Sequence, residues 1–313
     1  MNERRKDVYY ASDDQRTRIH AREWLPEGCP IAVIQISHGI TEHMGRYEGI
    51  AEYFVKMGYV VVGNDHLGHG QSIENPDSFM CCGHWEWLVE DTWRLLCFMK
   101  QQYPGLPYYI VGFSLGSFVM RDLLAQHPDC ADAAVLIGTG FQARSQLSAA
   151  KALVSLEAKR VGENHTSKWI QALSFGTYNR YFKPNRTDFD WLCEDTGSLD
   201  EYIRDETCGK YISAGLFREL LRGMMRTGKQ DAIEKIRKNL PILLLSGEND
   251  PVGEMGKGVA RIQNAFLETG MTDVSVKMYP GRHDILHDAC GQDVLKDMGD
   301  WLEDQSAFFS NDL

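Results

Sequence analysis

A serine flanked by two glycines is the clearest chemical feature of the 313-residue sequence. Gly112-Phe113-Ser114-Leu115-Gly116 directly follows an apolar run at 108–111 and directly precedes a stretch of helical period. A serine on such a strand-to-helix turn is held exposed as a nucleophile, and the turn is too tight for bulky flanking residues. The motif predicts nucleophilic catalysis by Ser114, with Gly112 and Gly116 as supporting residues.

Serine is a weak nucleophile and needs a base, and a third group must orient that base. For a serine in this setting the partners follow in the order acid, then histidine, in loops at the carboxyl ends of strands. His283 follows the last apolar run, and Asp250 follows the run before it. We therefore predict a triad of Ser114, Asp250 and His283, with Glu248 as the alternative acid.

Acyl chemistry also needs backbone donors where negative charge develops on the carbonyl oxygen. One donor should be the N–H of Leu115, at the start of the helix that follows the serine. The second should come from Ser37-His38-Gly39-Ile40, where Gly39 lets the chain turn so that the N–H of Ile40 faces the site. His38 and Gly39 are thus predicted as supporting residues of this loop.

Two histidine groups offer an alternative metal-binding interpretation. His283 and His287, with Asp284 and Asp288, have the spacing of ligands on one helix face, but Pro280 and Gly281 just upstream indicate a loop. His66 and His69 lie near Asp65 among glycines, a pattern more typical of a tight turn after a strand. We expect neither a metal nor a cofactor.

The elements around these residues alternate between short β-branched runs and amphipathic stretches. The segment 8–25 has an alternating pattern around a group of polar turn residues, which predicts an antiparallel hairpin. The predicted strands are 31–36, 59–62, 108–111, 133–137, 241–245 and 274–278, and the predicted helices 47–57, 85–102, 115–126 and 291–303. Alternation of this kind predicts an α/β fold with a mostly parallel, doubly wound sheet.

The alternation stops after Gly140. Residues 141–238 have helical character, many aromatic residues and no convincing strand. An insertion of this length within a domain is rarely a structureless loop. We predict a core formed by 1–140 and 239–313, and a helical cap formed by 141–238.

Composition excludes several classes of protein. Lys and Arg total 33 and Asp and Glu total 44, a net charge of −11 that disfavours nucleic acid and anionic membranes as partners. No apolar run approaches the roughly 18 residues of a membrane span, and the charged N-terminus lacks a signal-peptide pattern, so we expect no stable membrane anchor.

Eight scattered cysteines match neither a disulfide framework nor a zinc site, which favours a cytoplasmic protein. The sequence indicates no oligomeric state.

Several motifs together resemble the monoacylglycerol lipase and lysophospholipase branch of the α/β-hydrolase fold, a group similar to the serine aminopeptidase S33 ("hydrolase 4") type. The resemblance covers 31–135 and 242–301. It is carried by His38-Gly39-Ile40-Thr41-Glu42-His43-Met44-Gly45-Arg46-Tyr47, Asn64-Asp65-His66-Leu67-Gly68-His69-Gly70-Gln71-Ser72, Gly112-Phe113-Ser114-Leu115-Gly116-Ser117, Ser246-Gly247-Glu248-Asn249-Asp250-Pro251-Val252 and Gly281-Arg282-His283-Asp284. It implies Ser114 as nucleophile, His283 as base, Asp250 as orienting acid, and the N–H groups of Ile40 and Leu115 as oxyanion hole.

The cap departs from the lipase lids of this branch, so the substrate is the least determined part of the prediction. A serine hydrolase of a small acyl ester or lipid, such as a monoacylglycerol or lysophospholipid, is the leading hypothesis. Phenolic-acid esterase, thioesterase, proline-releasing aminopeptidase and non-catalytic ligand binding are the alternatives. An aminopeptidase needs a cap carboxylate for the substrate ammonium, and six are candidates: Glu157, Glu163, Asp188, Asp190, Glu194 and Asp195.

The cap is also rich in aromatic residues, which at helical spacing most often form the core of the cap itself. They are Trp169, Phe175, Tyr178, Tyr181, Phe182, Trp191 and Tyr202. We expect a few of them to line the acyl pocket, with Trp169 and Phe175 as candidates that set the preferred acyl length.

Overall fold

The computed structural model describes residues 4–173 and 175–310, and within them eight strands form one sheet. The strand order is β1-β2-β4-β3-β5-β6-β7-β8. The first two strands form an antiparallel hairpin that pairs antiparallel with β4, and all further pairs are parallel. The strands are β1 Arg5–Ala11, β2 Arg18–Trp24, β3 Ala32–Ser37, β4 Tyr59–Asn64, β5 Tyr108–Phe113, β6 Ala133–Ile137, β7 Ile242–Gly247 and β8 Val274–Tyr279.

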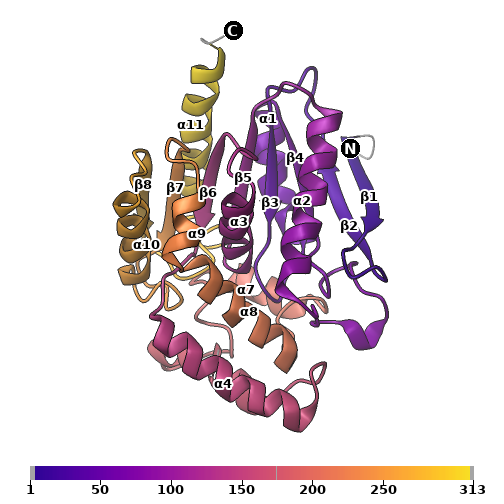
Figure 1. Ribbon diagram of the computed structural model, residues 1–313, viewed down its shortest axis with the longest axis vertical. Helices are drawn as coiled ribbons and strands as arrows, with labels where there is room; N and C mark the ends of the chain where they lie inside the picture. The colour runs from indigo at the N-terminus through magenta and orange to yellow at the C-terminus, as the bar shows by residue number, and fades with distance from the viewer. Residues whose placement is uncertain (1–3, 174, 311–313) are drawn as a thin grey trace.

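The central strands are apolar on both faces because helices cover both sides of the sheet. Neighbouring residues of β3 show this: Val33 packs into one apolar cluster with α2, α3 and α10, and Ile34 into another with α1 and α11. Figure 1 shows the sheet between these two helix layers. The covering helices are α1 Glu48–Lys56, α2 Trp85–Gln102, α3 Leu115–Gln126, α10 Lys257–Glu268 and α11 Gly291–Ser310, with 3-10 turns η2 Met44–Tyr47 and η3 Pro76–Ser78.

The predicted fold class is confirmed by this architecture. The helices predicted at 85–102 and 115–126 have the observed bounds of α2 and α3, and the predicted strands agree with the observed ones to within a few residues. The last helix continues beyond the predicted end at residue 303 to Ser310. Within the described residues, no helix is both long enough and apolar enough to cross a membrane.

Residues 141–238, the proposed cap, are mainly helical. Figure 1 shows α4 and α8 at the end of the sheet where the parallel strands finish. Leu147 and Val154 of α4 pack with Ala214 and Leu221 of α8 in a small apolar cluster separate from the two sheet clusters. The helices are α4 Arg144–Val161, α5 Lys168–Leu173, α6 Phe175–Asn179, η4 Arg180–Phe182, α7 Thr196–Arg204, α8 Ala214–Thr227 and α9 Gln230–Lys235.

A buried arginine of α3 contacts the chain just before the insertion and again at the end of α8, near the end of the insertion. The Arg121 guanidinium donates to the carbonyl oxygens of Gly140, at 2.9 Å, and Thr227, at 3.1 Å. Among the described residues it has no carboxylate partner, and burial lowers the pKa of this arginine to about 9. Beyond Thr227, α9 returns to the sheet layer, where Ile233 packs in the same apolar cluster as α3. Arg121 thus fixes the two points where the chain leaves and rejoins the helix layer of the core.

Candidate active site

Ser114 occupies a strained turn between β5 and α3. Its backbone has φ 51° and ψ −115°, in a region that L-residues with a side chain rarely adopt. The neighbouring glycines allow close packing: a Cβ on Gly116 would lie 1.9 Å from the carbonyl oxygen of Ser37, and one on Gly112 would lie 2.6 Å from the carbonyl oxygen of Gly116. The positive φ therefore falls on the serine itself, and the glycines are needed because β3 and the first turn of α3 approach so closely.

The three residues predicted as a triad lie together in one hydrogen-bonded chain. Nε2 of His283 lies 2.8 Å from Oγ of Ser114, and its Nδ1 lies 2.9 Å from Oδ1 of Asp250. Asp250 Oδ1 also accepts the N–H of Val252 at 2.8 Å, which fixes the carboxylate. Asp250 and His283 are buried, whereas Ser114 is partly exposed. This arrangement can move a proton from Ser114 to His283 and stabilise the resulting imidazolium.

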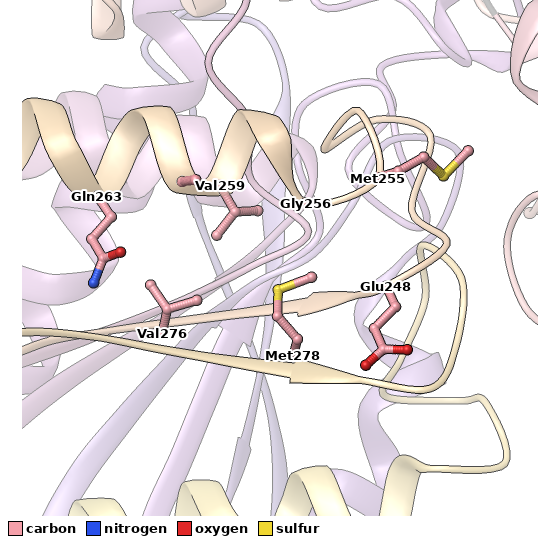
Figure 2. A pocket seen from close by; sticks show the side chains of 8 residues that line it. Glu248, Met255, Gly256, Val259, Gln263, Val276 and Met278 are labelled. Atoms are coloured by element: carbon pink, nitrogen blue, oxygen red, sulfur yellow. The ribbon is translucent and has the colours of Figure 1, made fainter.

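Glu248, the alternative acid, lies elsewhere. It is exposed, and it lines a cavity of 310 Å³ together with Val259 of α10 and Met278 of β8. Figure 2 shows its carboxylate among these side chains. The ring nitrogen of His283 that needs an acid is already bonded to Asp250. The geometry therefore favours Asp250.

The loop proposed for the oxyanion hole lies beside the serine turn. A Cβ on Gly39 would lie 3.0 Å from the ring of Phe113, the residue before Ser114. Leu115 is the first residue of α3, so its N–H belongs to the first helical turn, where amides have no partner within the helix. The roles of the Ile40 and Leu115 N–H groups as oxyanion donors remain a prediction.

His38, predicted to support this loop, belongs to a group of three buried histidines. Its Nδ1 lies 2.7 Å from the carbonyl oxygen of Gly39, and its Nε2 accepts the N–H of His66 at 2.9 Å. The rings of His38 and His66 lie 4.3 Å apart, and His69 packs against both. Burial holds the pKa of all three below its ordinary value, that of His66 at about 3 and that of His69 at about 4. These are neutral rings that stiffen the loop.

This neutral cluster predicts a loss of stability in mild acid. Below pH 6.5 the unfolded chain takes up protons that the folded protein excludes, so the free energy of unfolding should fall as the pH decreases from 6.5 toward 4. Each such histidine contributes about 1.4 kcal/mol per pH unit. His69→Asn, which keeps a donor for the Leu67 carbonyl oxygen, should flatten the slope by about that amount. Urea unfolding of both proteins between pH 7.5 and 4.5 measures the difference, and parallel curves would contradict the prediction.

A buried network of charges, which the sequence interpretation missed, connects the loop proposed for the oxyanion hole to the loop that carries His283. Glu42 Oε1 accepts the N–H of Gly39 at 2.5 Å, and its other oxygen binds Arg46. Arg46 in turn donates to Asp284 Oδ2 at 3.0 Å, and His287 Nδ1 lies 2.9 Å from the other oxygen of Asp284. Burial raises the pKa of Asp284, but the nearby His287 and Arg46 outweigh it and hold that pKa well below its usual range. The i, i+4 spacing of Glu42 and Arg46 was the available sequence signal.

A cap tryptophan covers the histidine. The rings of Trp191 and His283 lie 5.3 Å apart at an angle of 30°, and Trp191 also stacks on Phe175 at 5.5 Å. Trp191 is 4% exposed and His283 1%. Trp169, by contrast, is 48% exposed, so the expectation that it shapes the acyl pocket is not supported by its position.

The structure does not favour metal binding at the candidate histidines. Both ring nitrogens of His283 have partners in the triad, and those of His287 face Asp284 and the Arg46 carbonyl oxygen. A further group, His43, Asp205 and Cys208, brings three potential ligand atoms together. There Nδ1 of His43 accepts the N–H of Gly45, so the ring proton sits on Nε2 and is donated to Asp205 at 2.8 Å. A metal would need that same nitrogen.

The six cap carboxylates considered for an amine-binding role are engaged or exposed. Five have partners and Asp188 is exposed. The partners are Arg160 and Ser167 for Glu157, Arg218 for Glu163, the Arg186 and Thr187 amides for Asp190, Arg282 for Glu194, and the Ser198 amide for Asp195. Within the described residues, none of the six forms a hydrogen bond or an ion pair with Ser114 or His283.

Comparisons with known proteins agree with one another. The family model described as serine aminopeptidase, S33 (Hydrolase_4) matches residues 28–289. The chain is 27% identical over 287 residues to the monoglyceride lipase homolog of monkeypox virus, covering 91% of this chain and 94% of that protein. It is 26% identical over 293 residues to rat monoglyceride lipase, covering 92% and 88%. A thermostable carboxyl esterase from Bacillus coagulans, solved with glycerol, superposes with a TM-score of 0.88 at 24% identity over 96% of this chain and 99% of the other.

Proposed function

Since the chain belongs to the serine aminopeptidase S33 (Hydrolase_4) family, we propose that it is a serine hydrolase that cleaves carboxylic ester bonds through an acyl-enzyme. The family predicted from the motifs is confirmed by this match. The observation that carries the proposal is the continuous hydrogen-bond chain from Asp250 through His283 to Ser114.

In the proposed mechanism, Ser114 Oγ attacks the ester carbonyl carbon while His283 Nε2 takes its proton. The N–H groups of Ile40 and Leu115 stabilise the oxyanion. When the tetrahedral intermediate collapses, the C–O bond to the alcohol breaks, and His283 returns the proton to the leaving oxygen. Water then attacks the acyl-enzyme with His283 again as base, which releases the carboxylic acid and restores Ser114.

We propose a monoacylglycerol or a similar small acyl ester as substrate. Two relatives are described as a monoglyceride lipase and a homolog of one, and they align over most of both chains. Five of the six cap carboxylates considered are already paired and Asp188 is exposed, which argues against an aminopeptidase, because a substrate ammonium would need an unpaired carboxylate within the site. Lysophospholipase, thioesterase and phenolic-acid esterase activities are the remaining candidates, since they use the same catalytic groups.

An acyl-length series tests this substrate class. We expect kcat/KM for esters of one alcohol to rise over the first several carbons, because each buried methylene contributes about 0.8 kcal/mol, and then to fall once the pocket is full. Phe175→Ala should shift the acyl length at which kcat/KM is highest, because Phe175 is buried against Trp191. Trp169→Ala is the matched control, because the Trp169 side chain is exposed. A flat series combined with efficient cleavage of aminoacyl arylamides would support the aminopeptidase instead.

We also propose that the protein works in the cytoplasm. All eight cysteines are free thiols in the structure. A reducing compartment keeps thiols in this state.

A further inference from the structure

A cavity lined mainly by basic side chains lies where the cap helices meet the core. Its volume is 370 Å³, and small-molecule sites begin at about 300 Å³. It shares no lining residue with the proposed catalytic site. In a chain with a net charge of −11, such a concentration of positive charge does not follow from composition. The basic lining residues are Arg144 and Lys151 of α4, Arg222 and Arg226 of α8, and Lys229 and Lys235 at the two ends of the α9 segment.

Four of these six basic side chains form no ion pair within residues 4–173 and 175–310. They are Arg144, Lys151, Lys229 and Lys235. The two others are paired with glutamate or aspartate: Arg222 binds Glu86 and Glu219, and Arg226 binds Glu86 and Asp122. Lys151 is half-buried rather than fully exposed. Like charges around one cavity repel each other, and a bound anion would remove that cost.

The two acidic residues of the lining, Asp122 and Asp231, do not neutralise the cavity. Asp122 is buried, and its carboxylate already accepts hydrogen bonds from Trp85 Nε1 at 2.7 Å and Arg226 Nε at 2.9 Å. Asp231 is exposed, and in the described part of the chain it forms no ion pair with the basic residues of the lining. The unpaired basic residues therefore lack counter-charges from the chain itself.

Helix stability does not explain the position of Arg144. This residue begins α4, and the positive end of a helix dipole favours negative charge there. The first turn of α4 contains no acidic residue, and the N-cap, Ala143, makes no side-chain hydrogen bond to it. A guanidinium at this position is unfavourable for the helix alone but suits a bound anion.

We propose that this basic cavity binds a small, multiply charged phosphate compound, such as a diphosphate, at the boundary between cap and core. Lys and Arg are the side chains that bind phosphoryl oxygens. The unpaired basic residues come from separate elements, so an anion with more than one phosphoryl group can contact more of them than a single phosphate can. The ligand would connect α4 and α8 of the proposed cap with α3 of the core, since all three line the cavity.

Isothermal titration calorimetry with sodium pyrophosphate, at fixed ionic strength and without divalent cations, tests the site. We expect saturable binding of pyrophosphate to the wild type and much weaker binding of inorganic phosphate. Lys151→Gln should weaken pyrophosphate binding by roughly tenfold, because a charge-assisted hydrogen bond is lost, and Lys151→Arg should retain it. Lys159→Gln is the matched control: Lys159 is exposed on the same helix but does not line the cavity, so this variant should bind like the wild type.

The readout is binding, so the result does not depend on ester hydrolysis. Absence of saturable binding to the wild type would overturn the proposal. Equal weakening by Lys151→Gln and Lys159→Gln would also overturn it, because general attraction to a basic helix would then explain the binding. Equal affinity for phosphate and pyrophosphate would overturn the preference for a multiply charged ligand. Circular dichroism establishes that the variants fold, and Lys235→Gln, at an exposed position of the cavity, should weaken binding in the same way.

A lipid surface is distinguished from a free phosphate compound by a second arm of the experiment. The protein is sedimented with phosphatidylcholine vesicles that contain or lack phosphatidic acid. We expect no sedimentation that depends on phosphatidic acid at a concentration where pyrophosphate saturates the site. Sedimentation with phosphatidic acid in the absence of pyrophosphate binding would overturn the proposal in favour of a membrane contact.

Discussion

Replacing Ser114 by alanine should reduce ester hydrolysis by about a millionfold while leaving the protein folded. The nucleophile is lost, and only substrate binding and the oxyanion donors remain to accelerate attack by water. Ser114 is partly exposed and its side chain adds little to packing, so the melting temperature should change little. The strain of its positive φ stays with alanine, because alanine also has a Cβ.

The measurement is single-turnover hydrolysis of a p-nitrophenyl ester, with thermal unfolding recorded on the same samples. Ser117→Ala is the matched control: Ser117 lies one turn along α3 and its hydroxyl donates to the Ser114 carbonyl oxygen at 2.6 Å, not to the reacting atoms. This variant should retain most of the activity. Hydrolysis at the wild-type rate by folded Ser114→Ala would refute the assignment of the nucleophile.

Asp250→Asn should lower kcat by roughly ten-thousandfold. In the folded protein the carboxylate accepts a hydrogen bond from Nδ1 of His283, which leaves Nε2 free to take the proton of Ser114. An amide at this position can present its NH₂ group to Nδ1, which places the ring proton on Nε2 and removes the base. The asparagine side chain otherwise has the shape of the aspartate, so the fall in kcat reflects the lost base and not a change in folding.

Glu248→Gln is the control for the acid. Glu248 follows the same strand but is exposed beside α10, so this variant should retain near wild-type kcat. The two variants are compared at saturating substrate, with circular dichroism to establish folding. A severe loss in Glu248→Gln together with an active Asp250→Asn would reverse the assignment.

The core could be predicted from the sequence because its elements are locally consistent. The strands β3 to β7 are short apolar runs, and α2 and α3 have a strong helical period, so tertiary contacts agree with local preference. The end of α11 was predicted too early because Leu302 is the last buried residue among its described side chains, and the apolar period on which the prediction depends ends there.

The candidate site was only partly predictable. Ser114, Asp250 and His283 each follow a recognisable strand, so their approach to one another follows from the parallel topology. Trp191 carries no comparable signal, since its position depends on how the insertion folds back over the sheet. For Arg46 the only local signal is its i, i+4 spacing from Glu42, which does not reveal its contact with Asp284. Aromatic residues in the cap look alike in sequence, yet Trp191 is buried on His283 and Trp169 is half exposed. Only the tertiary contacts of the folded chain distinguish Trp191 from Trp169.

Arg121 has a consequence for how this architecture can be re-engineered or can diversify. Because one α3 side chain binds the carbonyl oxygens of Gly140 and Thr227, the chain leaves the core at 140 and returns to nearly the same place at 227, before α9. These are main-chain acceptors, so any residue can supply them. Segments of different length and sequence can therefore be exchanged between these two points, provided that Arg121 and α9 are retained. A chimeric protein joined at 140 and 227 should keep the reaction chemistry of this core and take its substrate range from the donor.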